Sequence, residues 1–130
     1  MKTLLPPGWP RPKGYANAVS ASGRLIFTAG VIGWDAQERI VAPDLVGQFR
    51  QILLNTLAIL AEDGAGPEHV VRMTWYVVDR DEYVASLAET GAIYRALMGK
   101  HYPAMAVVQV AGLVEPAARI EIETIAVVPQ

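Results

Sequence analysis

Hydrophobic and polar residues follow each other along the first third of the chain in short runs. Two β-prone runs, 15–20 and 24–32, flank Ser22 and Gly23, a pair that is typical of a hairpin turn. The dozen residues before them contain four prolines, which cannot donate backbone hydrogen bonds to a sheet. The pattern therefore predicts an irregular extended arm followed by a β-hairpin.

A longer apolar repeat over residues 45–63 has the spacing of a helix. Apolar residues recur there at intervals of three, four and seven, while Gln48, Gln51 and Asn55 fall mostly on the opposite side. Asp44 is placed to cap the first turn, and Gly64 with the proline beyond it ends the repeat. We expect one amphipathic helix with a polar outer side.

The second half of the chain predicts a strand, a helix and two more strands. Residues 69–79 alternate, with Val71, Met73, Trp75 and Val77 on one side. A helix is expected over 81–98. It buries Val84, Leu87, Tyr94 and Leu97, and Gly99 ends it. Residues 104–114 are apolar on both sides, and 118–128 alternate strictly in their first half.

The order of elements is ββαβαββ, which indicates an α+β fold. Helices at both crossovers place two helices on one face of a mixed sheet of about five or six strands. The strand over 104–111 has no polar side to present to water. We therefore expect another copy of the chain to cover the second face of the sheet.

Composition narrows the classes of function. The 130 residues fit one domain, 1–130. Hydrophobic residues make up 52% of them, and counting glycine as well lifts the share above the usual ~45–50%, which favours buried subunit interfaces. The formal net charge is −2 and the basic residues are scattered. No nucleic acid is expected as a partner.

Several kinds of site and segment are absent from the sequence. There is no cysteine, and the two histidines lie in no metal-binding spacing, so we expect no metal and no other cofactor. Three acidic residues at 79–82 suit the start of a helix better than a cation site. No signal peptide or membrane span is predicted, and we expect a cytoplasmic protein without a membrane partner.

Glu121 is the strongest candidate for chemistry. In "RIEIET", Arg119, Glu121 and Glu123 share one side of a strand and could form a solvated row of charges. Glu121 lies, however, in an otherwise apolar half of the chain. A carboxylate partly removed from water at a subunit seam holds its proton more tightly and can pass it through a water molecule.

Other polar and aromatic residues could line a pocket beside Glu121. These are Tyr15, Asn17, Trp34 and Gln109. Tyrosine and tryptophan are more often core residues with one wet end, and His101, just before Pro103, is interpreted as a surface histidine. None of these residues identifies a site by itself.

These segments, in this order, resemble the RidA/YjgF family of reactive-intermediate deaminases, also known as L-PSP endoribonucleases. "GYANAV" resembles the family's G-P-Y-x-Q-A-V, and "LIFTAGVI" its strand ending in S-G-Q. The helix leading into "HYPA" resembles its segment before F-P-A-R, and "IEIETIAV" its closing E-I-E-x-I-A. The resemblance spans nearly the whole chain. It implies a chorismate-mutase-like homotrimeric barrel with three pockets at subunit interfaces.

The resemblance also implies an activity and its residues. Deaminases of the family hydrolyse imines and enamines, with the substrate carboxylate held by an arginine after P-A and the closing-strand glutamate associated with water. By position, Glu121 is that glutamate, while Tyr15 and Gly30 match the family's tyrosine and glycine. The arginine is missing, and Met105 occupies its position.

Further departures surround Met105. Ala29 and Val31 replace polar residues on either side of the glycine, Asn17 replaces a glutamine, and Val107 stands where a cysteine or polar residue is frequent. Methionine cannot donate a hydrogen bond or carry charge. We therefore expect the substrate-binding residues to suit a neutral or hydrophobic small molecule rather than a simple 2-imino acid. Met105→Arg should raise activity toward small 2-imino acids unless Arg72, Lys13 or Arg11 already supplies the charge.

Three functions remain open at this point. One is a divergent imine or enamine hydrolase that uses Glu121 to activate water. Another is a non-catalytic small-molecule binder or metabolic sensor that uses the same pocket. The third, the ribonuclease of the family's older name, is disfavoured by the acidic charge balance.

Overall fold

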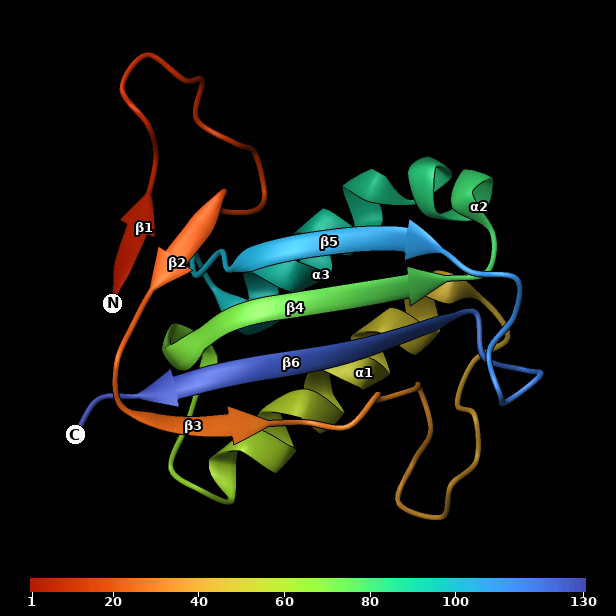
Figure 1. Cartoon of the computed structure of the whole chain (residues 1–130). Helices are drawn as coiled ribbons and strands as arrows, with labels where there is room; N and C mark the ends of the chain where they lie inside the picture. Colours follow the sequence, from red (N-terminus) through yellow and green to blue (C-terminus); the bar gives the residue numbers. More distant parts are fainter.

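Figure 1 shows the computed structural model of the chain, which describes residues 1–130. Its main sheet has four strands in the order β3-β6-β4-β5. These are β3 (Arg24–Phe27), β6 (Ile120–Val128), β4 (Val70–Val77) and β5 (Ala104–Gln109). β4 and β5 are parallel, whereas β6 runs antiparallel to both of its neighbours. The α+β order of elements predicted from the sequence is confirmed.

A second, separate sheet pairs β1 (Lys2–Leu4) with β2 (Ala18–Ser20). The predicted hairpin across Ser22 and Gly23 is therefore wrong, because β2 and β3 belong to different sheets. Gly23 has a φ of +146°, and a Cβ there would collide with the backbone of Val128. Because Gly23 lies this close to the end of β6, β3 begins alongside β6 and does not fold back along β2. Part of the arm that was predicted to be irregular forms β1. The protein has six strands, but they form one sheet of four strands and one of two, and not the single sheet that was expected.

All helices lie behind the main sheet in the view of Figure 1, and the front face carries none. They are α1 (Leu45–Ala61), α2 (Arg80–Ala85) and α3 (Leu87–Met98), with a 3-10 turn over Pro67–His69. None of them combines the length and the hydropathy that a membrane-spanning helix needs. The sheet thus has one covered face and one open face.

The predicted second helix is interrupted at Ser86. Its φ of −103° and ψ of 9° leave the helical region, and both its backbone N–H and its hydroxyl donate to the Tyr83 carbonyl. A serine side chain that bonds the preceding turn competes with the helix in this way. Val84 and Leu87, predicted as buried, are about half exposed. The capping role of Asp79 is confirmed, because its carboxylate accepts hydrogen bonds from two backbone N–H groups of α2.

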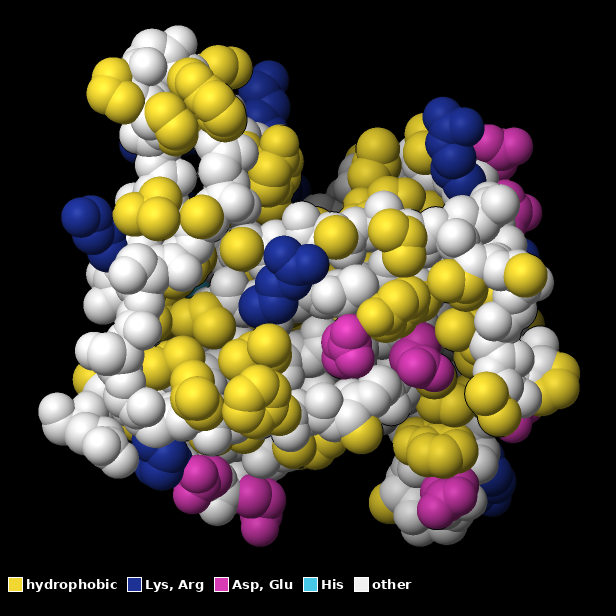
Figure 2. Space-filling view, in the orientation of Figure 1, with side chains coloured by type: hydrophobic (Ala, Val, Ile, Leu, Met, Phe, Trp, Pro, Cys, Tyr) yellow, Lys and Arg dark blue, Asp and Glu magenta, His cyan; other side chains and the backbone are white.

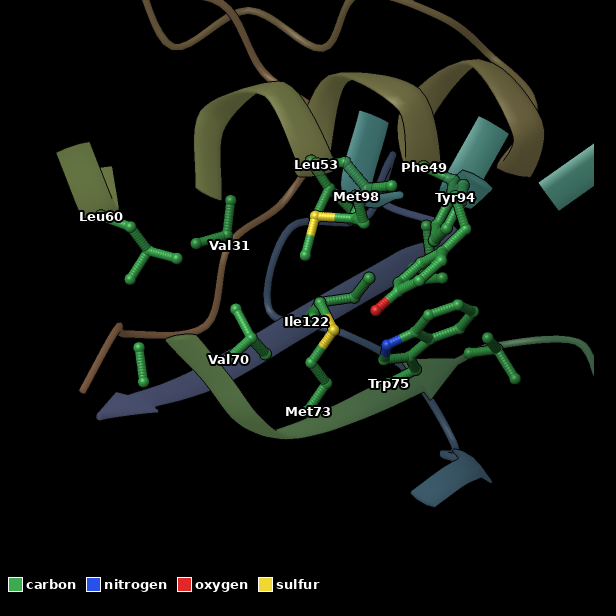
Figure 3. Packing of buried hydrophobic residues seen from close by; sticks show 14 of the residues in the cluster. Val31, Phe49, Leu53, Leu60, Val70, Met73, Trp75, Tyr94, Met98 and Ile122 are labelled. Atoms are coloured by element: carbon green, nitrogen blue, oxygen red, sulfur yellow. The ribbon is translucent and has the colours of Figure 1, made fainter. Parts of the chain in front are cut away.

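The core lies between α1, α3 and the covered face (Figure 3). Phe49, Met73 and Ile122 are fully buried in it. A register shift between Val70 and Arg72 turns Val70 into this core in place of Val71. The covered face thus reads Val70, Met73, Trp75, Val77, and only the start of the predicted alternation is wrong.

Gln48 is an exception to the prediction that the polar residues of α1 lie mostly on the outer side. Its side chain is fully buried. The amide nitrogen donates to the carbonyls of Ala42 and Ala117, at 2.9 and 3.0 Å, and the amide oxygen accepts the Arg119 N–H at 2.7 Å. A buried amide is tolerated when its hydrogen bonds are satisfied. Gln48 thereby ties α1 to the chain that enters β6.

Candidate functional site

Glu121 lies on the open face of β6. Side chains alternate along a strand, and Ile120 and Ile122 are fully buried toward the helices. Glu121 and Glu123 consequently share the opposite face, as predicted, and Figure 2 shows two acidic side chains in the middle of it. Arg119 does not join them, because its guanidinium donates to Glu82 at 2.8 and 3.0 Å.

The two glutamates of this face differ in their partners. Glu123 accepts a hydrogen bond of 2.6 Å from the hydroxyl of Tyr76. This bond is the main cause that raises the pKa of Tyr76, followed by desolvation and the nearby carboxylates. Glu121 has no hydrogen-bond or ion-pair partner in the chain. Its carboxylate is therefore free to contact a ligand or a water molecule.

Gly30 lies directly against the Glu121 carboxylate. A Cβ on this glycine would overlap the carboxylate, with the Glu121 Cδ only 2.8 Å away. The segment is held beside β6 by two backbone hydrogen bonds between Val31 and Ile122, of 2.8 and 3.0 Å. Val31 points its side chain into the core, while Ala29 is exposed. Glycine at 30 is what permits this close contact.

Trp34 stands beside Glu121, a placement that the sequence left open. A hollow of about 260 Å³ is lined by Gly30, Ile32, Trp34, Val114, Glu115 and Glu121. The Asn55 side chain donates to the Trp34 carbonyl at 2.9 Å and fixes this loop on α1. The hollow thus combines an unpaired carboxylate with an aromatic wall.

Met105 and Val107 lie on the other face of the sheet. In the parallel register Met105 pairs with Met73 and Val107 with Trp75, both buried on the covered face. The two β5 side chains line a cavity of about 490 Å³ between α3, β5 and the loop before β2. Five aromatic residues line the same cavity: Tyr15, Trp75, Tyr83, Tyr94 and Tyr102.

Tyr15 reaches this cavity because the Ala16 N–H donates to the Pro103 carbonyl at 2.9 Å. This bond joins the segment before β2 to the start of β5. Asn17 lines a neighbouring hollow of about 350 Å³, which Tyr15 and Tyr102 also line. Gln109 is used structurally, since its side-chain oxygen accepts the Arg80 N–H at 2.7 Å. Of the predicted binding residues, Tyr15, Met105 and Val107 thus come together.

Two cationic side chains line the cavity beside Met105. They are Lys13, one of the residues considered from the sequence, and Arg95 of α3, which was not considered. Arg72 lies on the open face and Arg11 in the hollow of Asn17. No three His, Asp or Glu side chains are arranged to hold a metal ion.

The aromatic walls were also missed as site residues, because the sequence interpretation assigned Trp75 and Tyr94 to the core. Both are indeed almost fully buried. The overlooked signal is in α3, where Thr90 and Gly91 offer little side-chain volume opposite these rings. Small residues on the inner side of a helix can leave space that larger neighbours do not fill.

Glu121 and Met105 therefore belong to two half-sites on opposite faces of one sheet. We name the hollow around Glu121 the acidic half-site and the cavity beside Met105 the aromatic half-site. Within one chain a small ligand cannot contact both. Two chains are required to bring a Glu121 and a Met105 together.

Comparisons with known proteins identify the family of the chain. The model of the family described as Endoribonuclease L-PSP matches residues 10–128. A RutC family protein of Synechocystis is 32% identical, with 99% of this chain and 98% of the relative covered. A Salmonella typhimurium protein named 2-iminobutanoate/2-iminopropanoate deaminase is 35% identical over 81% of this chain and 80% of its own.

A solved structure has the same fold over nearly the full length. It is the Rid family protein YyfB of Yersinia pestis, described as of unknown function, with a TM-score of 0.83 and 33% identity. The alignment covers 98% of both chains. The match of the family model runs through all the helices and the four strands of the main sheet. The chain belongs to the RidA/YjgF family, also called the endoribonuclease L-PSP family.

Proposed function

We propose that the protein hydrolyses the C=N bond of an imine, or of the imine tautomer of an enamine, in a pocket between two subunits of a homotrimer. The observation that carries the proposal is the Glu121 carboxylate, which has no partner in the chain and lies against Gly30 at the wall of a hollow. The deaminase name of the Salmonella relative supports the same class of reaction.

Glu121 acts on water in this proposal. Its carboxylate accepts a proton as a water oxygen bonds to the imine carbon, and the C=N bond becomes a C–N single bond. Return of that proton to nitrogen gives a carbinolamine. Glu121 then accepts the proton of the carbinolamine hydroxyl and passes it to nitrogen, so that ammonia leaves as the carbonyl forms. One imine and one water thus give one carbonyl compound and one ammonia. General base catalysis of this kind contributes roughly 10²- to 10⁴-fold to a rate.

The two half-sites explain why the pocket needs more than one subunit. The open face exposes large apolar side chains on β3, with Leu25 and Phe27 at 58% and 66% exposure. Covering this face with a second copy would remove that surface from water. The same contact can bring the aromatic half-site of one subunit to the acidic half-site of the next.

The substrate is expected to be more hydrophobic than a small 2-imino acid. Met105 and Val107 offer neither charge nor a hydrogen bond where the family resemblance places the carboxylate anchor. A charged hydrogen bond of that kind is worth about 1.5–3 kcal/mol, so small imino acids should bind roughly 10- to 100-fold more weakly without it.

Glu121→Gln tests the role of the carboxylate. The variant keeps the shape of the side chain, loses the base, and should release ammonia at least about 100-fold more slowly while the subunit assembly is unchanged. Glu115→Gln is the matched control, because Glu115 lines the same hollow and has no assigned role. Undiminished ammonia release by Glu121→Gln would exclude the mechanism.

A second candidate function is a non-catalytic binder of a hydrophobic metabolite. The missing anchor at Met105 favours it, because the pocket can then retain a ligand without aligning a carboxylate for hydrolysis. A thermal-shift screen against a metabolite panel separates the two functions. Compounds that stabilise the protein without forming ammonia or any other product would support the binder.

A further inference from the structure

We propose that the aromatic half-site binds an aromatic ring that carries an acid group, with Lys13 and Arg95 binding the acid. This assigns a substrate class to the proposed function and rests on it for the chemistry that follows binding. The cavity lies between α3, β5 and the loop before β2, and Figure 1 shows where these elements lie in the fold. It is on the covered side of the sheet, away from Glu121.

The walls of the cavity are aromatic and held in place by the core. Trp75 and Tyr83 meet edge to face at 6.2 Å and 88°, and Tyr94 stacks on Tyr102 at 5.6 Å. Trp75 and Tyr94 are 4% and 5% exposed, and Figure 3 shows both among the buried core side chains. Aromatic pairs in these arrangements attract a further ring in the same way. The cavity is thus preformed for a flat apolar group.

The volume of the cavity suits a molecule of one or two rings. A cavity of about 150 Å³ can take up benzene, and this one measures about 490 Å³. The space remains because Gly91 has no side chain and the Thr90 hydroxyl bonds back to the Ser86 carbonyl at 3.1 Å. A Cβ on Gly91 would contact only the Arg95 guanidinium, at 3.4 Å.

The charge around the cavity is positive. Lys13 and Arg95 both line it, and no acidic residue does. Neither cation forms a salt bridge in the chain. Both residues are exposed, so water screens their attraction for an anion, and binding of the acid group depends on a ring that holds it beside them. Lys13 and Arg95 can therefore bind an acid group that a ring holds beside them, whereas a small imino acid without a ring still lacks the anchor that is missing at Met105.

Calorimetric titration of the full-length protein with three probes tests the proposal. Indole-3-acetate has a ring and an acid, indole has only the ring, and acetate has only the acid. We expect indole-3-acetate to bind at least about tenfold more tightly than either fragment, because each part adds its own contacts. Equal affinity for acetate and indole-3-acetate, or no binding of indole-3-acetate, would overturn the proposal.

Gly91→Leu tests the cavity itself. Leucine has a better helix propensity than glycine, so the fold should persist while the side chain occupies the space. Binding of indole and indole-3-acetate should weaken by about tenfold or more. Ala92→Leu, at the next, exposed position of α3, should leave both affinities unchanged. If Gly91→Leu binds indole and indole-3-acetate as the wild type does, the ring does not bind in this cavity.

Lys13→Gln and Arg95→Gln test the acid group. Each variant should bind indole-3-acetate roughly three- to tenfold more weakly than the wild type and should bind indole with unchanged affinity. Arg50→Gln, an exposed and unpaired arginine of α1, serves as the charge control. If Arg50→Gln weakens binding as much as Lys13→Gln and Arg95→Gln do, the effect is one of net charge and the anchor assignment is wrong.

Measuring ring binding and ammonia release on the same wild-type protein separates this inference from the proposed function. Retained ring binding with no ammonia released from any imine would contradict only the hydrolase. Ammonia release from small imines by a protein that does not bind indole-3-acetate would contradict only the aromatic half-site.

Discussion

At the scale of single residues, Gly30 sets the position of the proposed catalytic carboxylate. Its backbone does not require glycine, since its φ is not positive, but a methyl group there would overlap Glu121. Gly30→Ala should therefore fold normally and displace the carboxylate. A misplacement of about 1 Å can cost as much as 10²-fold in rate, and we expect a loss of roughly tenfold or more.

Steady-state ammonia release and thermal unfolding of Gly30→Ala would be measured together. Gly112→Ala is the control, because a Cβ at Gly112 meets nothing within 4 Å. A lower melting temperature with unchanged turnover would show that Gly30 serves packing and not the position of Glu121.

Thr124 offers a test of stability at a single atom. Its hydroxyl is buried without a hydrogen-bond partner, although its backbone N–H donates to the Thr28 hydroxyl at 3.0 Å. Thr124→Val removes the unsatisfied hydroxyl and keeps the shape of the side chain. We expect the free energy of unfolding to rise by about 1 kcal/mol, measured by urea denaturation. Thr28→Val removes the hydroxyl that accepts the Thr124 N–H, and it should lower the free energy of unfolding by a similar amount.

At the scale of elements, Tyr94 connects α3 to the segment that enters β5. Its hydroxyl donates to the His101 carbonyl at 2.5 Å. Tyr94→Phe should lower the free energy of unfolding by about 1 kcal/mol at neutral pH. Tyr83→Phe is the control, because the Tyr83 hydroxyl has no hydrogen bond in the chain and its loss should have little effect.

The buried hydroxyl groups of Tyr94 and Tyr83 also predict that the stability of the protein depends on pH. Burial raises the pKa of Tyr94, with a smaller contribution from Tyr102, and burial also raises the pKa of Tyr83. A raised pKa stabilises the folded protein below the unfolded value of about 10, and that stability is lost as the pH rises further. Wild type should therefore lose stability above about pH 10 more steeply than Tyr94→Phe does. If the stability of both proteins falls in parallel with pH, folding does not raise the pKa of Tyr94 and the prediction is wrong.

Several elements followed directly from local patterns. Strict alternation in the first half of residues 118–128 put Glu121 on the side opposite Ile120 and Ile122, because a strand has a period of two. The helical repeat over 45–63 located α1 for a similar reason. Gln48 was misplaced because the partners of its amide, Ala42 and Ala117, come from loops whose position no repeat encodes.

Pairing between distant segments was not predictable in this way. The turn at Gly23 looked like a hairpin because two β-prone runs flank it. The partner of β3 is β6, about a hundred residues later in the chain. Nor did the sequence indicate that Met105 and Glu121 face opposite ways, since that depends on the register of β5 against β4. The sequence thus indicated Glu121, Tyr15 and Met105 as candidates, but neither the division between two faces nor the aromatic walls of the cavity.

At the scale of the whole molecule, the open face of the sheet is the surface expected between subunits. Phe27, on the edge strand β3, is exposed by 66%, and apolar side chains surround the acidic pair on this face (Figure 2). Phe27→Asp should break up the proposed trimer, because a buried charge without a partner is strongly disfavoured. Sedimentation velocity would show a smaller species.

The control for this variant is Val84→Asp on α2, which is half exposed on the helical side. It should leave the assembly unchanged. A wild-type protein that sediments as a monomer, or a Phe27→Asp variant that still forms trimers, would remove the argument that the open face is covered by a second copy.

The position of Glu121 and the aromatic half-site on opposite faces has a consequence for trimers of mixed subunits. If each pocket is formed by one half-site from each of two chains, two variants with impaired pockets can complement each other. Subunits with Glu121→Gln and subunits with Gly91→Leu, unfolded and reassembled together in equal amounts, should recover up to about a quarter of wild-type activity, because random trimers pair intact halves at that frequency. Neither variant should gain activity when it is unfolded and reassembled alone, and a mixture no more active than its parts would mean that each pocket is built from a single chain.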